Sequence, residues 1–193
     1  KLDFASKTGQ SLAFWLKPDT DNPRDVALFS NVNHLGSPAD TSYGKGREIR
    51  LIDGEIEVTF SDRFPVYALI VRSVGAAIQP GDWRHVVISY TGGRNFANLR
   101  FFIDGQELPT RVIYDGVTSE QPKKDFLIGA DNAKAGVRWR GALDDVRAFP
   151  SAINPDVVHA HFAARALPRA RAHVDLTTAT ALERTWLSAA LNP

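Results

Sequence analysis

The sequence contains no cysteine and no methionine among its 193 residues. Without cysteine, the chain forms no disulfide, offers no thiolate to a metal ion and has no cysteine nucleophile. A c-type haem is excluded as well, because its attachment motif requires two cysteines. The absence of cysteine does not indicate the cellular compartment, since a β domain of this size can be secreted without disulfides.

A strong net charge and long apolar runs are also absent. Lys and Arg total 23 against 22 Asp and Glu, a formal net charge of +1. This balance gives no reason to expect nucleic acid or an anionic membrane surface as a partner. No apolar run approaches the roughly 20 residues of a bilayer-spanning helix, so we expect no membrane insertion.

Several enzyme signatures are missing from the chain. There is no G-x-S-x-G, P-loop or Rossmann glycine pattern. The histidines form no constellation: His159 and His161 are two apart on a predicted helix and point in different directions, so they cannot chelate one metal ion together. These observations argue against the common hydrolase, nucleotide and dinucleotide sites.

What is present is a two-residue alternation of apolar and polar side chains. Leu12, Phe14 and Leu16 share one strand face, for example, which is typical of antiparallel strands with one wet face. About ten short strands with frequent turn signals favour a β-sandwich or a barrel. The strand candidates are residues 11–18, 26–31, 47–52, 55–62, 67–74, 83–90, 99–104, 110–115 and 126–131.

Two Asp-Gly pairs connect consecutive strand candidates directly. Asp53-Gly54 follows IRLI, and Asp104-Gly105 follows FFI. Both pairs tolerate the positive φ angles of a tight turn, so each predicts a two-residue hairpin.

The period changes near residue 150. Asn154 is a candidate N-cap, Pro155 suits the first helical position, and Val158 and Phe162 are four apart on one helix face. Residues 166–178 resemble a connector, and Thr180–Glu183 fits a capping box that begins another helix. We therefore expect a β domain over 1–163, with residues 164–193 forming a linker and a helix leading to a following domain.

The order of several short motifs carries a family resemblance. Ile103–Gly105 end a strand, Ile128-Gly129 follow, and Gly141–Phe149 read GALDDVRAF. Together with the Trp83-x-His85-Val86-Val87 stretch, these pieces resemble laminin G-like and pentraxin-like members of the concanavalin A-like lectin/glucanase superfamily, over residues 2–163. The implied fold is all-β: an antiparallel jelly-roll β-sandwich with a short C-terminal helical tail.

Two details of these motifs can be read from the residues alone. Trp83 stands at a strand entrance, where its ring is expected to cover one end of the core between the sheets. In GALDDVRAF, Leu143 and Val146 are three apart, so either a bulge lies between them or both strand faces are covered. Arg147 beside two aspartates suggests an internal ion pair.

The resemblance implies calcium as a structural cofactor. Calcium takes several oxygen ligands, and the aspartate of the last core strand binds it in many relatives. Asp144 matches that position, and Asp3 from the N-terminal strand is its candidate partner. The alternative is that Asp144 and Asp145 accept backbone N–H groups and pair with Arg147 or Arg140.

Long polar loops are the candidate ligand sites, since binding residues collect on loops held by a rigid sandwich. Oxygen and amide groups there suit sugar hydroxyls or a cation, and an aromatic ring can stack on a sugar. The alternative is ordinary turn chemistry, with Trp139 packed on a sheet edge. The candidates are Asn31, Asn33, Asp40, Tyr43, Asp131, Asn132 and Trp139.

We therefore expect a non-catalytic recognition module that binds carbohydrate, or neighbouring protein domains of the same polypeptide, through its loops or concave sheet. One alternative is a structural spacer that docks flanking domains, and another is a diverged glycoside hydrolase. The paired-carboxylate motif of sandwich glucanases has no match here. A further resemblance, to inserts of planctomycete-type cytochrome-containing multidomain proteins, implies an excised piece of a larger exported bacterial protein in an extracytoplasmic location.

Overall fold

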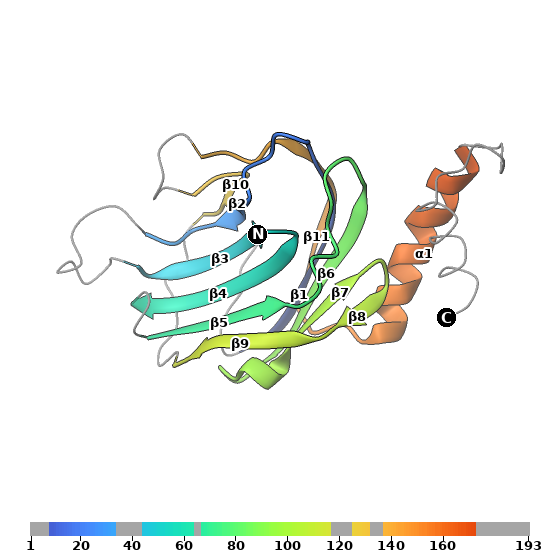
Figure 1. The fold of residues 1–193 in the computed structure, drawn as a ribbon. Coiled ribbons are helices and arrows are strands. Elements are labelled where there is room, and N and C mark those ends of the chain that lie inside the picture. The colour runs from blue at the N-terminus through green and yellow to red at the C-terminus, as the bar shows by residue number, and fades with distance from the viewer. Residues whose placement is uncertain (1–7, 34–43, 64–66, 117–124, 132–136, 173–193) are drawn as a thin grey trace.

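The computed structural model describes residues 8–33, 44–63, 67–116, 125–131 and 137–172. Two antiparallel sheets pack face to face, and helix α1 lies along the outer side of one of them (Figure 1). The elements are β1 (Thr8–Pro18), β2 (Asp25–Ser30), β3 (Gly46–Ile52), β4 (Glu55–Arg63), β5 (Tyr67–Ser73), β6 (Arg84–Gly92), η1 (Phe96–Asn98), β7 (Leu99–Ile103), β8 (Gln106–Leu108), β9 (Thr110–Asp115), β10 (Leu127–Ile128), β11 (Gly141–Phe149) and α1 (Pro155–Ala172).

Within these residues, one sheet has the strand order β11-β1-β6-β7-β8 and the other has the order β10-β2-β3-β4-β5-β9. We call them the five-stranded and the six-stranded sheet. The first and last strands of the sandwich, β1 and β11, are neighbours, with Ser11 opposite Phe149. This arrangement confirms the all-β jelly-roll sandwich expected from the alternating pattern.

The main core fills the space between the two sheets. Phe14 of β1 and Phe29 of β2 meet edge to face across it, with ring centroids 5.1 Å apart. Phe60 and Tyr90 form a second ring contact between the sheets, with tilted rings and centroids also 5.1 Å apart. Each fully buried side chain of this size contributes about 1.5 to 3 kcal/mol through the hydrophobic effect. The sandwich is therefore held together chiefly by these inward-facing residues.

A second apolar layer lies between the five-stranded sheet and α1. Ala13, Val87 and Phe102 point away from the main core and pack in one cluster with Val158 of the helix. The two-residue alternation predicts a wet outer face on such strands, and this prediction is wrong for the five-stranded sheet. The alternation was read correctly, but the helix covers the second face.

Trp83 belongs to this second layer as well. It packs against the cluster of Trp15, Phe162 and Ala166, which lies under the helix. The expected position at one end of the main core was therefore wrong. Alternation along the strand could not reveal that a helix would cover the outer face.

Helix α1 begins as its sequence predicts and ends later. The Asn154 side-chain oxygen accepts a hydrogen bond from the backbone N–H of Val157 at 2.9 Å, which confirms the N-cap. The helix then runs without a break to Ala172, through residues 166–172 that were assigned to a connector. Pro168, which belongs to the predicted connector, lies inside the helix. The proposed domain boundary at residue 163 therefore falls within α1.

The turn predictions are confirmed in detail. Asp53 and Gly54 have φ angles of 51° and 82°, and Asp104 and Gly105 have φ angles of 51° and 81°. These are the positive values that a two-residue hairpin of this kind requires. The turns join β3 to β4 and β7 to β8.

A bulge in the GALDDVRAF strand accounts for the three-residue spacing between Leu143 and Val146. The register between β1 and β11 shifts between Ala13 and Trp15, which lie opposite Arg147 and Asp144. Asp145 has a φ of 48° at this point, and its carboxylate binds the guanidinium of Arg147 at 2.8 Å. The expected ion pair is confirmed, and Arg165 of α1 adds a second contact to the same carboxylate at 3.0 Å.

The predicted capping box at Thr180–Glu183 lies outside the described residues. Among the helical residues that are described, none form a segment with the length and hydropathy needed to cross a membrane.

Candidate functional site

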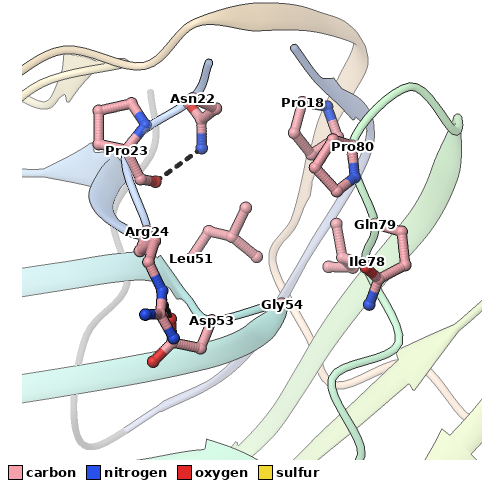
Figure 2. Close-up of a pocket in the computed structure, with 10 residues that line it drawn as sticks. All are labelled: Pro18, Asn22, Pro23, Arg24, Leu51, Asp53, Gly54, Ile78, Gln79 and Pro80. Carbon is pink, nitrogen blue, oxygen red and sulfur yellow. Dashed lines mark hydrogen bonds and ion pairs between the residues drawn. The ribbon is translucent and has the colours of Figure 1, made fainter. Parts of the chain in front are cut away.

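A hollow of about 250 Å³ lies at one end of the sandwich (Figure 2). Three connections meet there: the β1–β2 loop, the β3–β4 turn and the β5–β6 loop. Its size falls slightly below the roughly 300 Å³ at which pockets for drug-sized ligands begin. The hollow therefore suits a small group, such as one ring of a larger ligand.

Backbone hydrogen bonds tie the three connections together. The N–H of Asp53 donates to the carbonyl of Arg24 at 2.8 Å, and the N–H of Ile78 donates to the carbonyl of Gly54 at 3.1 Å. The N–H of Gly81 donates to the carbonyl of Pro18 at 2.7 Å. These bonds form the hollow before any ligand arrives, so binding there costs little ordering entropy.

The floor of the hollow is apolar. Leu51 and Ile78 are 4% and 3% exposed and belong to the main core. Pro18, Pro23 and Pro80 line the walls (Figure 2). The buried Leu51 and Ile78 support the hollow from the core, and the prolines add carbon surface at its walls.

The rim of the hollow is polar. The Arg24 guanidinium and the Asp53 carboxylate form an ion pair at 2.6 Å on one side, with side chains 87% and 53% exposed. The Gln79 amide stands on the opposite side (Figure 2). Asn22 braces the wall, because its Oδ1 accepts from the backbone N–H of Arg140 at 2.9 Å. The rim thus presents an anion, a cation and amides above an apolar surface.

A separate charged cluster lies on the outer face of the six-stranded sheet, around Arg50 of β3. The guanidinium reaches Asp25 Oδ1 at 2.7 Å, Asp131 Oδ2 at 2.7 Å and Glu48 Oε1 at 3.1 Å. Glu48 and Asp131 have side chains only 7% and 2% exposed. Three carboxylates therefore share one guanidinium in a poorly solvated place.

Burial and charge act in opposite directions in this cluster. Burial raises the pKa of Glu48, and the Arg50 guanidinium only partly offsets this effect. Burial alone would lower the pKa of Arg50, but Glu48, Asp131 and Asp25 hold it above its usual value. Glu48 consequently takes up a proton at a higher pH than an ordinary glutamate does.

The same face carries further ion pairs on neighbouring strands. Arg72 of β5 contacts Glu57 of β4 at 2.5 Å, and Arg111 of β9 contacts Glu55 at 2.6 Å. Glu55 and Glu57 thus each meet a guanidinium group. The described part of this face is therefore a ladder of compensated charges, from Arg50 through Arg72 to Arg111.

Two of the predicted loop residues have structural partners. Asn31 Oδ1 accepts the backbone N–H of Arg47 at 2.7 Å, where the chain enters β3. Asn33 forms backbone hydrogen bonds with Lys45 and Gly44 across the same loop. Both follow β2, at the opposite end of the sandwich from the hollow.

The other predicted ligand residues lie in several places. Asp131 is part of the Arg50 cluster. Trp139 packs against the edge of the main core. It also lies close to Gly129, since a Cβ added to Gly129 would be 3.3 Å from the Cβ of Trp139. Asp40, Tyr43 and Asn132 lie outside the described residues. The described candidates are therefore not gathered in a single site.

Only one of the two predicted calcium ligands lies among the described residues. Asp3 lies outside the described residues. Asp144 is exposed, and its Oδ1 accepts the backbone N–H of Asp145 at 2.8 Å. In the described part of the chain, no three His, Asp or Glu side chains are grouped to hold a metal ion. Calcium at Asp144 stays a prediction.

The hollow was not found from the sequence. Its residues come from three segments whose local patterns signal only turns: Pro18 to Arg24, Asp53-Gly54, and Ile78 to Pro80. The only local signal in these segments is that three prolines, Pro18, Pro23 and Pro80, lie near turns. It could not show that the segments meet.

The fold and its motifs agree with a sequence-level match. Residues 2–159 match a laminin G-like family model described as the concanavalin A-like lectin/glucanases superfamily. This match covers most of the chain, which therefore belongs to that superfamily. A comparison with curated protein sequences gave no match.

Several solved structures with the same fold are described as binding domains or as a CBM40. The binding domain of Paraclostridial Mosquitocidal Protein 1 aligns with a TM-score of 0.61 at 17% identity, over 84% of this chain and 38% of that one. The Ruminococcus gnavus IT-sialidase CBM40 bound to alpha2,3 sialyllactose aligns with a TM-score of 0.59 at 11% identity, over 81% and 84%. The botulinum neurotoxin serotype D ligand binding domain in complex with N-acetylneuraminic acid aligns with a TM-score of 0.56 at 15% identity, over 86% of this chain and 39% of that one. At these identities the similarity establishes the fold, and this chain spans well under half of each toxin domain.

Proposed function

We propose that this domain is a non-catalytic carbohydrate-recognition module and that the hollow at the end of the sandwich holds one sugar ring. The observation that carries the proposal is the combination of an apolar floor with an exposed Arg24–Asp53 pair on the rim. A sugar ring has the same two-sided character, with C–H groups on its faces and hydroxyl groups around its edge.

The rim chemistry fits hydroxyl recognition. A carboxylate accepts two hydrogen bonds from neighbouring hydroxyls, and a guanidinium donates several in one plane. Arg24 and Asp53 orient each other, so both are positioned before the ligand binds. Because the floor is preformed by core residues, the binding free energy is not spent on ordering loops.

The comparisons support recognition of sugars, and the charge ladder argues against hydrolysis. Two of the solved structures with this fold hold sialyllactose or N-acetylneuraminic acid, as their descriptions say. Retaining and inverting glycosidases both need two carboxyl groups facing one bond. The outer-face carboxylates Glu55, Glu57 and Asp131 instead each face an arginine. We place this module in an extracytoplasmic, multidomain protein, where glycans are accessible.

A glycan array that includes neutral and sialylated oligosaccharides tests the proposal, with and without a calcium chelator. The best ligand is then titrated calorimetrically against Asp53→Asn and Arg24→Gln. Asn tolerates the positive φ of residue 53, so the turn is retained while the carboxylate is lost. Arg100→Gln is the matched control, because Arg100 forms an exposed pair with Glu107 elsewhere on the surface.

We expect at least a tenfold loss of affinity for both hollow variants and no change for the control. Binding that the hollow variants leave unaltered would place the site elsewhere and contradict the assignment. No binding to any glycan would overturn the carbohydrate proposal itself. Loss of binding with the chelator would support the calcium prediction.

A further inference from the structure

Two hydrogen-bond acceptors stand on opposite sides of the hollow (Figure 2). On one side, Asp53 Oδ1 accepts from Arg24 Nε at 2.6 Å, so Oδ2 is the oxygen left for a ligand. On the other side, Gln79 Nε2 donates to the backbone carbonyl of Ala76 at 2.8 Å. That bond sets the orientation of the amide and leaves Oε1 as its end for a ligand. Both groups can only accept, and one of them is an anion.

The donors on the rim come from Arg24. Both ends of the Asn22 amide are engaged, because Oδ1 accepts the backbone N–H of Arg140 and Nδ2 donates to the carbonyl of Pro23, each at 2.9 Å. Arg24 keeps its two terminal nitrogens, and its side chain is 87% exposed. A ligand that satisfies the whole rim must therefore donate at two places and accept at a third. Hydroxyl groups do both, whereas a carboxylate only accepts.

Negative charge is in excess around the hollow. The three connections that enclose it carry one arginine, Arg24, and four exposed aspartates, Asp19, Asp21, Asp53 and Asp82. One further cation, Arg140, pairs with Asp21 at 2.6 Å. Four negative charges thus stand against two positive ones. Charges within about 8 to 10 Å of one another interact at physiological salt, so this excess repels an anionic ligand.

We infer that the hollow selects a sugar ring without a charged group and disfavours a ring that carries a carboxylate. The inference rests on the proposed function and specifies the class of sugar that is bound. The ring hydroxyls donate to Asp53 and Gln79, and a ring oxygen accepts from Arg24. Two solved structures with this fold hold sialyllactose or N-acetylneuraminic acid, as their descriptions say, and sialic acid is a carboxylated sugar. The ligand class inferred for this chain therefore differs from theirs.

The exposed guanidinium of Arg24 does not reverse this preference. Its Nε is already bound to the Asp53 carboxylate. A ligand carboxylate on the terminal nitrogens would share the same guanidinium with Asp53 and would lie beside a like charge. It would also give Gln79 no donor. The second carboxylate therefore gains less from the pair than the first, and it pays for repulsion as well.

Matched ligands test the inference. A glycan array with neutral, uronic and sialylated oligosaccharides first identifies the neutral ring that binds best. Calorimetry then compares that ring with its C6 acid, in which a carboxylate replaces the CH₂OH group, and with the methyl ester of the acid. The ester has nearly the same size as the acid and no charge. We expect the neutral ring and the ester to bind about tenfold more tightly than the acid.

Salt and substitution separate charge from shape. The difference between ester and acid should shrink when NaCl is raised from about 20 mM to about 500 mM, because salt screens the repulsion. Asp53→Asn should weaken the neutral ring and narrow the same difference by about threefold or more. Gln79→Ala removes an uncharged acceptor, so it should weaken the ester and the acid equally. Glu107→Gln is the control, since it removes a half-exposed carboxylate of β8, outside the three connections, and should leave the difference unchanged.

The outcomes distinguish this inference from the function on which it rests. A carboxylated ring that binds as tightly as its ester, and loses affinity in Arg24→Gln, would overturn the selectivity and leave the sugar site in place. A preference that neither salt nor Asp53→Asn alters would also overturn it, because shape would then be the cause. Binding that both Arg24→Gln and Asp53→Asn leave intact, or no binding to any glycan, would contradict the site itself and the selectivity with it.

Discussion

The rings of Trp15 and Phe162 stack with centroids 6.0 Å apart, joining the five-stranded sheet to helix α1. Both side chains are fully buried, although Trp15 points away from the space between the sheets. The helix is therefore an integral layer of the domain. It also spans residue 163, where the sequence predicts the boundary between the domain and its tail.

Removing one of these rings should destabilise the whole domain. We expect Phe162→Ala to lower the free energy of unfolding by about 3 to 5 kcal/mol, because it opens a cavity beneath the helix. Val157→Ala is the matched control on the same helix, since Val157 is 39% exposed and should change stability by less than about 0.5 kcal/mol. Urea unfolding measures both. Equal, small effects would show that α1 is only loosely attached.

Acid should weaken the domain through His85, which lies beneath the same helix. Its ring is 5.2 Å from that of Trp15 and 6.0 Å from that of Phe162, and burial lowers its pKa to about 3. Between pH 6.5 and 3 the unfolded chain therefore binds a proton that the folded protein does not. The His85 contribution is complete above about pH 6.5 and is lost as the pH falls, by up to about 1.4 kcal/mol per unit.

Unfolding measured at several pH values from 7.5 to 4.5 tests this expectation. His85→Leu removes the titrating group and should flatten the profile. Val157→Ala, at a more exposed position of the same helix, carries no titrating group and should leave the slope unchanged. A slope that His85→Leu does not alter would assign the acid sensitivity to other groups.

Replacing Glu48 should stabilise the protein at neutral pH. Burial raises the pKa of this carboxyl group, so its ionised form opposes folding above its ordinary pKa. We expect Glu48→Gln to raise the unfolding temperature at pH 7.5, and to raise it less at pH 4.5, where the wild-type carboxyl is more often protonated. A lower unfolding temperature at pH 7.5 would mean that the ion pair with Arg50 outweighs the desolvation of Glu48.

Replacing Asp131 should have the opposite effect. Asp131 accepts a 2.7 Å hydrogen bond from Arg50, and its side chain is almost completely buried. Asp131→Asn should lower the free energy of unfolding by about 1.5 to 3 kcal/mol, the usual contribution of a hydrogen bond to a charged group. Chemical unfolding at pH 7.5 compares it with Glu48→Gln. The same sign for both variants would contradict the distinction between the two carboxylates.

Gly54 should be required for the shape of the hollow. Its φ is +82°, and a Cβ there would lie 2.7 Å from the carbonyl oxygen of Ile78. Gly81 has a similar φ of +89° but nothing within 4 Å, so Gly81→Ala measures the cost of the backbone angle alone. We expect Gly54→Ala to destabilise the domain by about 1 to 3 kcal/mol and by more than Gly81→Ala does. Equal effects in thermal unfolding would show that the close approach is not limiting.

Local features of the chain were predictable because their causes are local. The alternation in β1 identifies the strand, and the positive φ angles at Asp53-Gly54 follow from the residue types that tolerate them. The N-cap at Asn154 depends only on the residues that follow it. The three-residue spacing between Leu143 and Val146 allowed either a bulge or two covered strand faces, and the structure has a bulge at Asp145.

By itself, the sequence determined the strands, the turns, the start of the helix and the class of fold, because neighbouring residues decide backbone conformation and the alternation of faces. Only the tertiary structure decided which outer face would be covered, where Arg50 would find Asp131 from 81 residues away, and how three turns would enclose the hollow. These outcomes depend on how distant elements pack, and packing depends on the shape and burial of whole faces. A two-residue alternation shows that a strand has a second face, but it does not show which element packs against that face.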